Sequence, residues 1–207
     1  RHVKAGLNIL LIDSNRPVWR DCVMPFGRLR ESIGAIERAD IVIFTKCKGV
    51  TAEQKRAYCS YIKETKDIPV YFTAIRYGKP YPLFNSANVA IAQESRVMLV
   101  TGIANPQPLK AEIEERGAKV ELMQYGDHHN FSTAEFEEIA TRFSKSRCTM
   151  IVTTEKDATR IRMRKDLPQT VRDNIHALPI EVEFLDGEEK LFNNNIYDYV
   201  TENSRDS

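Results

Sequence analysis

The sequence Asp127-His128-His129 places one carboxylate and two imidazoles in three consecutive residues. Histidine can act as a general base, bind a metal ion or form ordinary hydrogen bonds in a loop, and a neighbouring aspartate is compatible with each role. The motif follows a strand-like run at residues 118–125 and precedes a helix that the capping-box pattern of residues 132–135 predicts. We therefore expect it in a short loop, where spacing alone leaves all three interpretations open.

A second polar segment contains Pro25, Gly27, Arg28, Arg30 and Glu31. Its arginines could bind phosphate oxygens through pairs of parallel hydrogen bonds. Taken alone, such a segment is more often an exposed charge cluster, so these residues are candidates for phosphate binding only in combination with other signals.

A third segment, Thr153-Thr154-Glu155-Lys156-Asp157, lies between a strand pattern and a helix pattern. By itself it is an ordinary helix-capping sequence. At the ligand-binding edge of a parallel sheet, however, the N–H groups of a helix start favour an anion such as phosphate.

The elements that would position these segments alternate between strand and helix. Apolar runs typical of buried parallel strands occur at residues 7–13, 39–46, 68–78, 96–103, 118–125 and 148–154, and helix patterns occur at residues 51–65, 105–117, from 132 onward and at 155–165. This order predicts an α/β fold, in which ligands bind beyond the carboxyl ends of the parallel strands. The loops at residues 101–105, 127–129 and 153–157 would then lie at such ends, together with Asp13 and Thr45-Lys46, and the arginines of the second polar segment follow Asp13 nearby in the sequence.

The chain is expected to form two lobes. Residues 1–78 would form the first lobe, residues 79–95 a connector, and residues 96–207 a smaller second lobe. The second lobe is expected to end in a β-hairpin, because Asp186-Gly187 lies between two alternating runs.

The composition is that of an ordinary globular protein. The 207 residues are 42% hydrophobic and 29% charged, with a net charge of +1, which argues against bulk attraction to nucleic acid. The four cysteines are scattered, as in a reduced intracellular protein. No run approaches the roughly 20 apolar residues that a membrane helix requires.

Five segments together resemble one protein family. The segments are PFGRLRES, RADIVIFTK, VTGIANPQPL, GDHHNFS and VTTEKDATR, in this order. They are similar to the tetraacyldisaccharide 4'-kinase family of lipid A (lipopolysaccharide) biosynthesis, over nearly the whole chain. The resemblance implies three-layer α/β/α lobes, the first P-loop NTPase-like and truncated, the second smaller and Rossmann-like.

The family's activity follows from the same resemblance. Its members use ATP and Mg²⁺ to phosphorylate the 4'-hydroxyl of a lipid-linked glucosamine disaccharide, at the cytoplasmic face of the inner membrane of Gram-negative bacteria. The implied partners are this lipid A precursor and the membrane surface, with no nucleic acid, and the protein is expected to be a monomer.

The resemblance also implies residue roles. His128 would assist a base together with a carboxylate outside this chain, Asp127 would hold its loop, and Arg30 and Glu31 would lie on the phosphate and metal side. Nucleotide or substrate binding is implied for Pro25, Gly27, Arg28, His129, Thr153, Thr154, Glu155, Lys156 and Asp157. The metal ligands are expected mainly upstream of this sequence.

One departure from the family is clear: the phosphate loop G-x-x-x-x-G-K-[ST] is absent from this sequence. We therefore expect a fragment that is inactive and poorly soluble alone. Two alternatives remain: a metal-dependent phosphoesterase that uses Asp-His-His as ligands, and a non-catalytic nucleotide-binding α/β domain. The phosphoesterase requires further aspartates, usually as D-x-D, and no D-x-D precedes Asp127.

Overall fold

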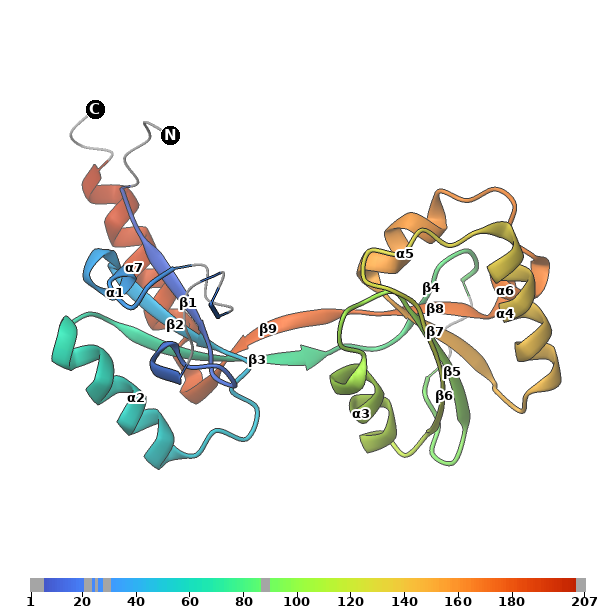
Figure 1. Cartoon of the computed structure of the whole chain (residues 1–207), viewed down its shortest axis with the longest axis horizontal. Helices are drawn as coiled ribbons and strands as arrows, with labels where there is room; N and C mark the ends of the chain where they lie inside the picture. Colours follow the sequence, from blue (N-terminus) through green and yellow to red (C-terminus); the bar gives the residue numbers. More distant parts are fainter. Residues whose placement is uncertain (1–5, 21–23, 25, 28–30, 87–89, 204–207) are drawn as a thin grey trace. The chain divides into compact units, whose positions relative to one another are not determined.

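The chain forms two compact units, which are described separately. The computed structural model describes residues 6–20, 24, 26–27, 31–86 and 90–203. One unit comprises the residues up to Arg76 and those from Val182 onward, and the other is Tyr77–Glu181 (Figure 1). The division falls within two strands, β3 (Val70–Tyr77) and β9 (Ile180–Phe184).

The first unit is built on a four-stranded sheet of order β1-β2-β3-β9. The strands β1 (Ile9–Asp13), β2 (Ile41–Thr45) and β3 run parallel, as their apolar sequences predicted. Asp13 pairs in register with Thr45, so the last residues of β1 and β2 lie side by side. Lys46 follows directly and forms an ion pair of 2.6 Å with Asp13.

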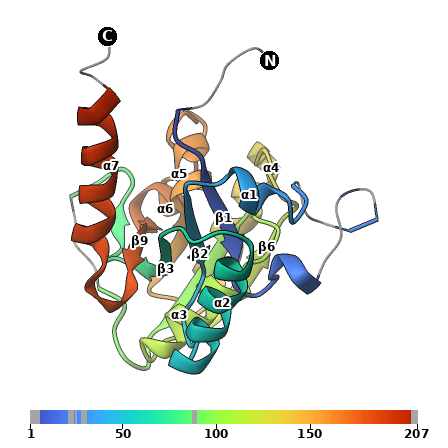
Figure 2. The ribbon, with the colours of Figure 1, turned by 90° about the vertical axis from the view of Figure 1, so that its left-hand side faces the viewer.

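Helices cover both faces of this sheet. On one face, α1 (Ala35–Arg38) and α2 (Ala52–Thr65) pack against a cluster that includes Phe44 and Phe72. A capping box of Thr51 and Gln54 begins α2, and the sequence had predicted Thr51 as the cap. On the other face, α7 (Glu189–Asn203) packs against β2 and β3 (Figure 2). A single 3₁₀ turn, η1 (Val18–Arg20), follows β1.

The expectation that β1 is buried on both faces is wrong. Ile9 and Leu11 are 39% and 63% exposed, whereas their partners on β2, Ile41 and Ile43, are buried. Alternate residues of a strand point to opposite faces. The cover that α7 provides over β2 and β3 therefore does not extend over β1.

The predicted C-terminal hairpin is also wrong. Asp186 and Gly187 do adopt positive φ angles, 59° and 74°, as a tight hairpin turn would require. They belong to a 3₁₀ turn, η2 (Leu185–Gly187), and the chain then continues into α7. Phe192 and Ile196, four residues apart, place α7 on the first sheet. Residues from 182 onward therefore lie in the first unit, and not in the predicted second lobe of residues 96–207.

The second unit is built on a five-stranded sheet of order β4-β8-β7-β5-β6. Its strands are β4 (Tyr81–Pro82), β5 (Arg96–Thr101), β6 (Lys119–Gln124), β7 (Met150–Thr154) and β8 (Ile175–Leu178). All pairs are parallel except β4 with β8. The strand β4 lies in the range predicted as a connector, and β8 was not predicted.

The helices of this unit are divided between the two faces of the sheet. They are α3 (Gln107–Glu115), α4 (Thr133–Lys145), α5 (Glu155–Arg162) and α6 (Gln169–Asn174). The cluster around Leu109 and Ile113 of α3 lies on one face, and the cluster that contains residues of α4, α5 and α6 lies on the other. The neighbouring strands β5 and β7 thus lead into helices on opposite faces. Such a reversal opens a crevice at the carboxyl ends of the two strands.

The position of α7 yields a stability prediction. Phe192→Ala should lower the free energy of unfolding by about 2 kcal/mol, because the ring packs edge-on against Tyr71 at 5.4 Å and stacks on Phe184 at 4.7 Å. Urea unfolding measures the change. The neighbouring exposed residue supplies the control: Leu191→Ala should change the stability little. Equal effects of both substitutions would contradict the packing of α7.

Candidate active site

The loops after β5, β6 and β7 converge at the carboxyl edge of the second sheet. Gly102 follows β5, and its carbonyl oxygen accepts a hydrogen bond of 3.1 Å from the backbone N–H of His128, which follows β6. A Cβ atom on Gly102 would lie 3.0 Å from the Cβ of His129 and 3.2 Å from the oxygen of Gly126. A side chain at position 102 would therefore force these two loops slightly apart, so the close approach favours glycine here.

A buried carboxylate connects the same edge to α5. Asp157 has no exposed surface, and its Oδ2 accepts hydrogen bonds from Thr101 Oγ1 (3.1 Å), Gly102 N (3.0 Å) and Thr154 Oγ1 (2.8 Å). Thr154 is also the N-cap of α5, since its hydroxyl accepts a bond from the N–H of Asp157. Oδ1 has no hydrogen-bond partner within the described residues and lies 4.0 Å from Arg160 Nη1.

His129 is engaged in holding the loop to α4. Its Nε2 lies 2.9 Å from a carboxylate oxygen of Glu135, and its ring stacks on Tyr125 with centroids 5.0 Å apart. Glu135 also accepts from the backbone N–H of Ser132, which completes the capping box that the sequence predicted. The side chain of His129 is therefore accounted for by local structure.

His128 is in a different environment. It adopts a left-handed backbone with φ = 60°, and 69% of its side chain is exposed. Its Nδ1 lies 3.2 Å from Arg160 Nη2, and its Nε2 lies 3.4 Å from Lys156 Nζ. Lys156 also donates a hydrogen bond of 3.0 Å to Asp127. This bond holds the pKa of Asp127 below its ordinary value.

A pocket of about 290 Å³ lies at the crevice between the ends of β5 and β7. Its lining residues are Tyr77, Ile103, Leu109, Thr154, Glu155, Lys156, Leu178 and Ile180. Most of the wall is aliphatic, and the polar residues come from the start of α5. Glu155 is fixed there, because its carboxylate accepts from the hydroxyl of Tyr81 (3.2 Å) and the backbone N–H of Ile180 (3.3 Å).

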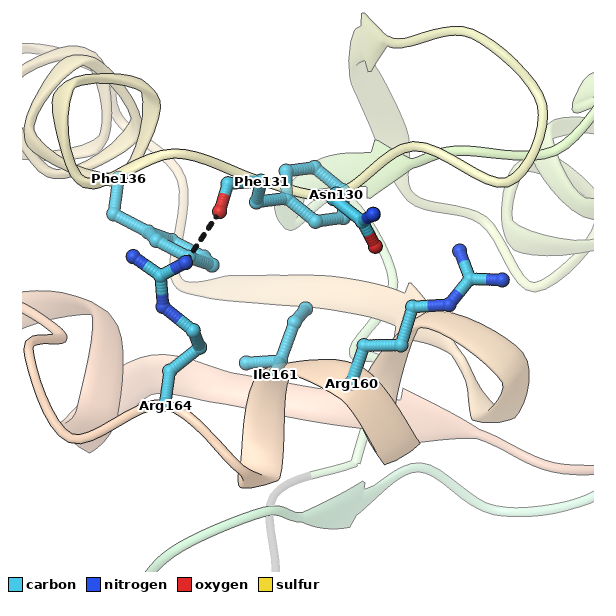
Figure 3. Close-up of a pocket in the computed structure, with 6 residues that line it drawn as sticks. All are labelled: Asn130, Phe131, Phe136, Arg160, Ile161 and Arg164. Atoms are coloured by element: carbon cyan, nitrogen blue, oxygen red, sulfur yellow. Dashed lines mark hydrogen bonds between the residues drawn. The ribbon is translucent and has the colours of Figure 1, made fainter.

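A smaller pocket, of about 140 Å³, lies between α5 and the loop before α4 (Figure 3). Phe131, Phe136 and Ile161 supply apolar walls. Arg164 donates to the backbone oxygen of Phe131 at 2.9 Å and forms an ion pair of 2.6 Å with Asp166. Arg164 is thus committed to structural contacts.

The candidates in the first unit are only partly described. Pro25, Arg28 and Arg30 lie outside the described residues, and Gly27 has a described backbone. Glu31 forms an ion pair of 2.7 Å with Arg38, in which both side chains are more than 60% exposed.

The same loops provide the candidate metal ligands. Within the part of the chain that the structure describes, no three His, Cys, Asp or Glu side chains form a group that could hold a metal ion. The rings of His128 and His129 also have different partners, Arg160 and Glu135. The described residues therefore provide no group of three such ligands, which a metal-dependent phosphoesterase would need.

Comparison with known proteins identifies the family. A family model described as tetraacyldisaccharide-1-P 4'-kinase matches residues 1–200. The chain belongs to the tetraacyldisaccharide 4'-kinase family. The resemblance that the five sequence segments indicated is thus confirmed.

Curated relatives in this family are longer than the chain. The tetraacyldisaccharide 4'-kinase of Phocaeicola vulgatus is 39% identical over 214 residues, which cover 100% of this chain and 58% of that protein. The corresponding protein of Bacteroides fragilis strain YCH46 is 41% identical over 217 residues, which cover 99% of this chain and 57% of that protein. The chain therefore spans a little over half the length of these relatives.

A solved structure supports the fold. A crystal structure of LpxK from Aquifex aeolicus in complex with ATP aligns with 95% of this chain and 53% of its own chain, with a TM-score of 0.61 and 23% identity. This likeness confirms the predicted α/β fold class. Among the described residues of this family member, no helix combines the length and apolar character needed to cross a bilayer.

The sequence placed Gly102 at this edge of the sheet, but sequence reasoning missed Arg160 as part of the site. Arg160 stands three residues after Asp157 and four after Lys156 in a predicted helix, so helical periodicity places all three near one another. That spacing was the available signal. The close approach at Gly102 had no comparable signal in the sequence.

The loop that carries the histidines should be sensitive to acid. Hydrogen bonds from Ser132 and from His129 lower the pKa of Glu135 from 4.5 to about 2. A carboxyl group with a depressed folded-state pKa stabilises the fold above its unfolded pKa, and this contribution is lost as the pH falls from about 4.5 to about 2. Thermal unfolding of wild type and Glu135→Gln across this range measures the effect. The variant should be less stable at neutral pH and should lose less stability than wild type on acidification.

Proposed function

We propose that the complete protein transfers the γ-phosphate of ATP to the 4'-hydroxyl of a tetraacylated glucosamine disaccharide phosphate, the substrate named for its relatives. The observation that carries this proposal is the state of His128. Its ring is exposed at the ligand-binding edge of a parallel sheet and is free of the structural contact that occupies His129. In a member of this kinase family, such a ring is available to the reacting groups.

The proposed chemistry is an in-line displacement at phosphorus. The 4'-oxygen attacks the γ-phosphorus, the bond to the β–γ bridging oxygen breaks, and ADP leaves. The hydroxyl proton passes to a base as the bond forms. We assign that base to a carboxylate outside this sequence, with His128 as its hydrogen-bonding partner and Asp127 holding the loop through Lys156.

Nucleotide binding by this chain is proposed at the pocket between the ends of β5 and β7. The pocket is large enough for a purine ring, and aliphatic walls such as Ile103 and Leu178 suit its flat apolar faces. Thr154 and Lys156 line the same pocket, and they would place a helix N-terminus and an ammonium group near the phosphate oxygens of a bound nucleotide. Thr153 and Asp157 support this edge from within, because both side chains are buried.

The remaining parts of the proposal rest on family membership. When bound, Mg²⁺ would neutralise charge on the transferred phosphoryl group, and its ligands and the phosphate loop are expected in a part of the protein not present in this sequence. Arg30, Glu31 and the residues Pro25, Gly27 and Arg28 are proposed on the phosphate side. We propose a monomer acting at the cytoplasmic face of a Gram-negative inner membrane.

A second candidate function applies to this chain by itself. The pocket lies entirely within Tyr77–Glu181, so the chain could bind a nucleotide without catalysing transfer. Isothermal titration of the 207-residue chain with ATP measures nucleotide binding, and a kinase assay on the same chain measures phosphoryl transfer. Binding without turnover would support the non-catalytic reading of the isolated chain.

Replacing His128 tests the proposed reaction. In the complete gene product, His128→Ala should lower kcat for 4'-phosphorylation by about 10²-fold or more, with little change in KM for ATP, because a proton-transfer contribution of this size is lost. His129→Gln is the matched control, and it should mainly lower the thermal midpoint. Unchanged turnover in His128→Ala would remove this residue from the mechanism.

Filling the pocket tests the nucleotide site. Ile103→Trp should raise KM for ATP about tenfold or more, since the added ring occupies the space proposed for the base, while kcat at saturation changes little. Met163→Trp, at a position that is 81% exposed, is the control for adding a tryptophan. An unchanged KM for ATP would place the base elsewhere.

A further inference from the structure

The exposed ring of His128 makes its shortest contact with Arg160, at 3.2 Å, and Lys156 Nζ lies 3.4 Å from its other nitrogen. The backbone of His128 is fixed, because its N–H donates to Gly102 O at 3.1 Å and to Asp127 Oδ1 at 3.0 Å. The ring itself is 69% exposed and would otherwise be free to rotate about its side-chain bonds. What holds the ring is the guanidinium group of Arg160, with Nη2 3.2 Å from Nδ1.

Arg160 is in turn held by its surroundings. Its Nη1 donates to the backbone oxygen of His129 at 3.2 Å and lies 4.0 Å from the buried carboxylate of Asp157, one turn earlier in α5. Figure 3 shows the side chain of Arg160 extending from α5 on the side of Asn130, with Ile161 between it and Arg164. The planar guanidinium group therefore spans the histidine loop and the buried carboxylate.

We propose that Arg160 is the positioning residue for His128, an inference that rests on the proposed kinase function. Arg160 and Lys156 both carry only donors, and a neutral ring can accept from only one of them. The shorter contact, 3.2 Å at Nδ1 against 3.4 Å at Nε2, assigns Nδ1 as the acceptor and places the ring proton on Nε2. Arg160 thereby sets both the rotamer and the tautomer of the ring.

The fixed tautomer specifies what His128 can do. With Nδ1 occupied by Arg160, the ring offers an N–H donor at Nε2, close to Lys156 Nζ at 3.4 Å. Two donors so close together cannot bond to each other, and both can bond to one anionic acceptor. Asp127 already lies near both groups, with Oδ1 3.0 Å from Lys156 Nζ and Oδ2 3.7 Å from His128 Nε2, so this pair of donors suits a carboxylate or a phosphate oxygen. His128 acts as the donor that orients the base, and the base itself is the acceptor.

A double-mutant cycle tests this role in the complete gene product. Arg160→Met should lower kcat about tenfold or more with KM for ATP within about twofold, since a ring that rotates freely is rarely in place. In the His128→Ala background, the same substitution should change kcat by less than about twofold, because Arg160 acts only through the ring. Arg160→Lys, which keeps one donor, should recover part of the lost kcat.

Arg164→Met is the matched control. Arg164 stands four residues further along, contacts Phe131 O and Asp166, and is not in contact with His128. Its substitution should lower the thermal midpoint and leave kcat near wild type. A loss of kcat in Arg164→Met equal to that in Arg160→Met would overturn the inference, because the effect would then reflect the pocket as a whole.

Three other outcomes would also overturn it. Wild-type kcat in Arg160→Met would show that the ring needs no such support. Equal losses with and without His128 would show that Arg160 binds substrate directly. Both results would leave the proposed function intact, whereas a wild-type protein without 4'-kinase activity would remove the function and this inference together.

Discussion

The buried carboxylate of Asp157 is the interaction on which the candidate site depends. Its Oδ2 accepts bonds from Thr101, from the backbone of Gly102 and from Thr154. It therefore joins the ends of β5 and β7 to the first turn of α5. Removing this fully buried side chain would leave the hydroxyl and N–H donors around it without an acceptor. From Gly102 the connection continues to the backbone of His128, so one carboxylate determines where the exposed ring is placed.

The two adjacent histidines show how environment separates residues that are identical in sequence. His129 faces the Glu135 of a helix cap and stacks on Tyr125, whereas His128 faces Arg160 and solvent. The capping box could be read from the sequence, and it placed the motif correctly before a helix. The partner of His128 could not be predicted, because it depends on a left-handed residue in the loop and on a helix that follows some thirty residues later.

The predictable parts of the fold were those specified by local sequence. The strand patterns of β2, β5 and β7 and the caps of α2 and α4 follow from apolar runs and from hydroxyl residues at helix starts. The exposure of one face of β1 could not be predicted, because it depends on α7, which packs on β2 and β3 but does not cover β1. The turn at Asp186-Gly187 has the backbone of a hairpin, yet its continuation is decided by Phe192 packing against the first sheet. The strand β8 has only four residues, too few for a recognisable pattern.

The second unit, Tyr77–Glu181, is inserted between two parts of the first. Its ends are neighbours, since the N–H of Gly78 donates to the oxygen of Pro179 at 2.9 Å. During synthesis, the residues of the inserted unit are therefore all translated before the end of β9 and before α7. The sheet that carries Asp13 and Lys46 therefore gains the end of β9 and the packing of α7 only after the whole second unit has been translated.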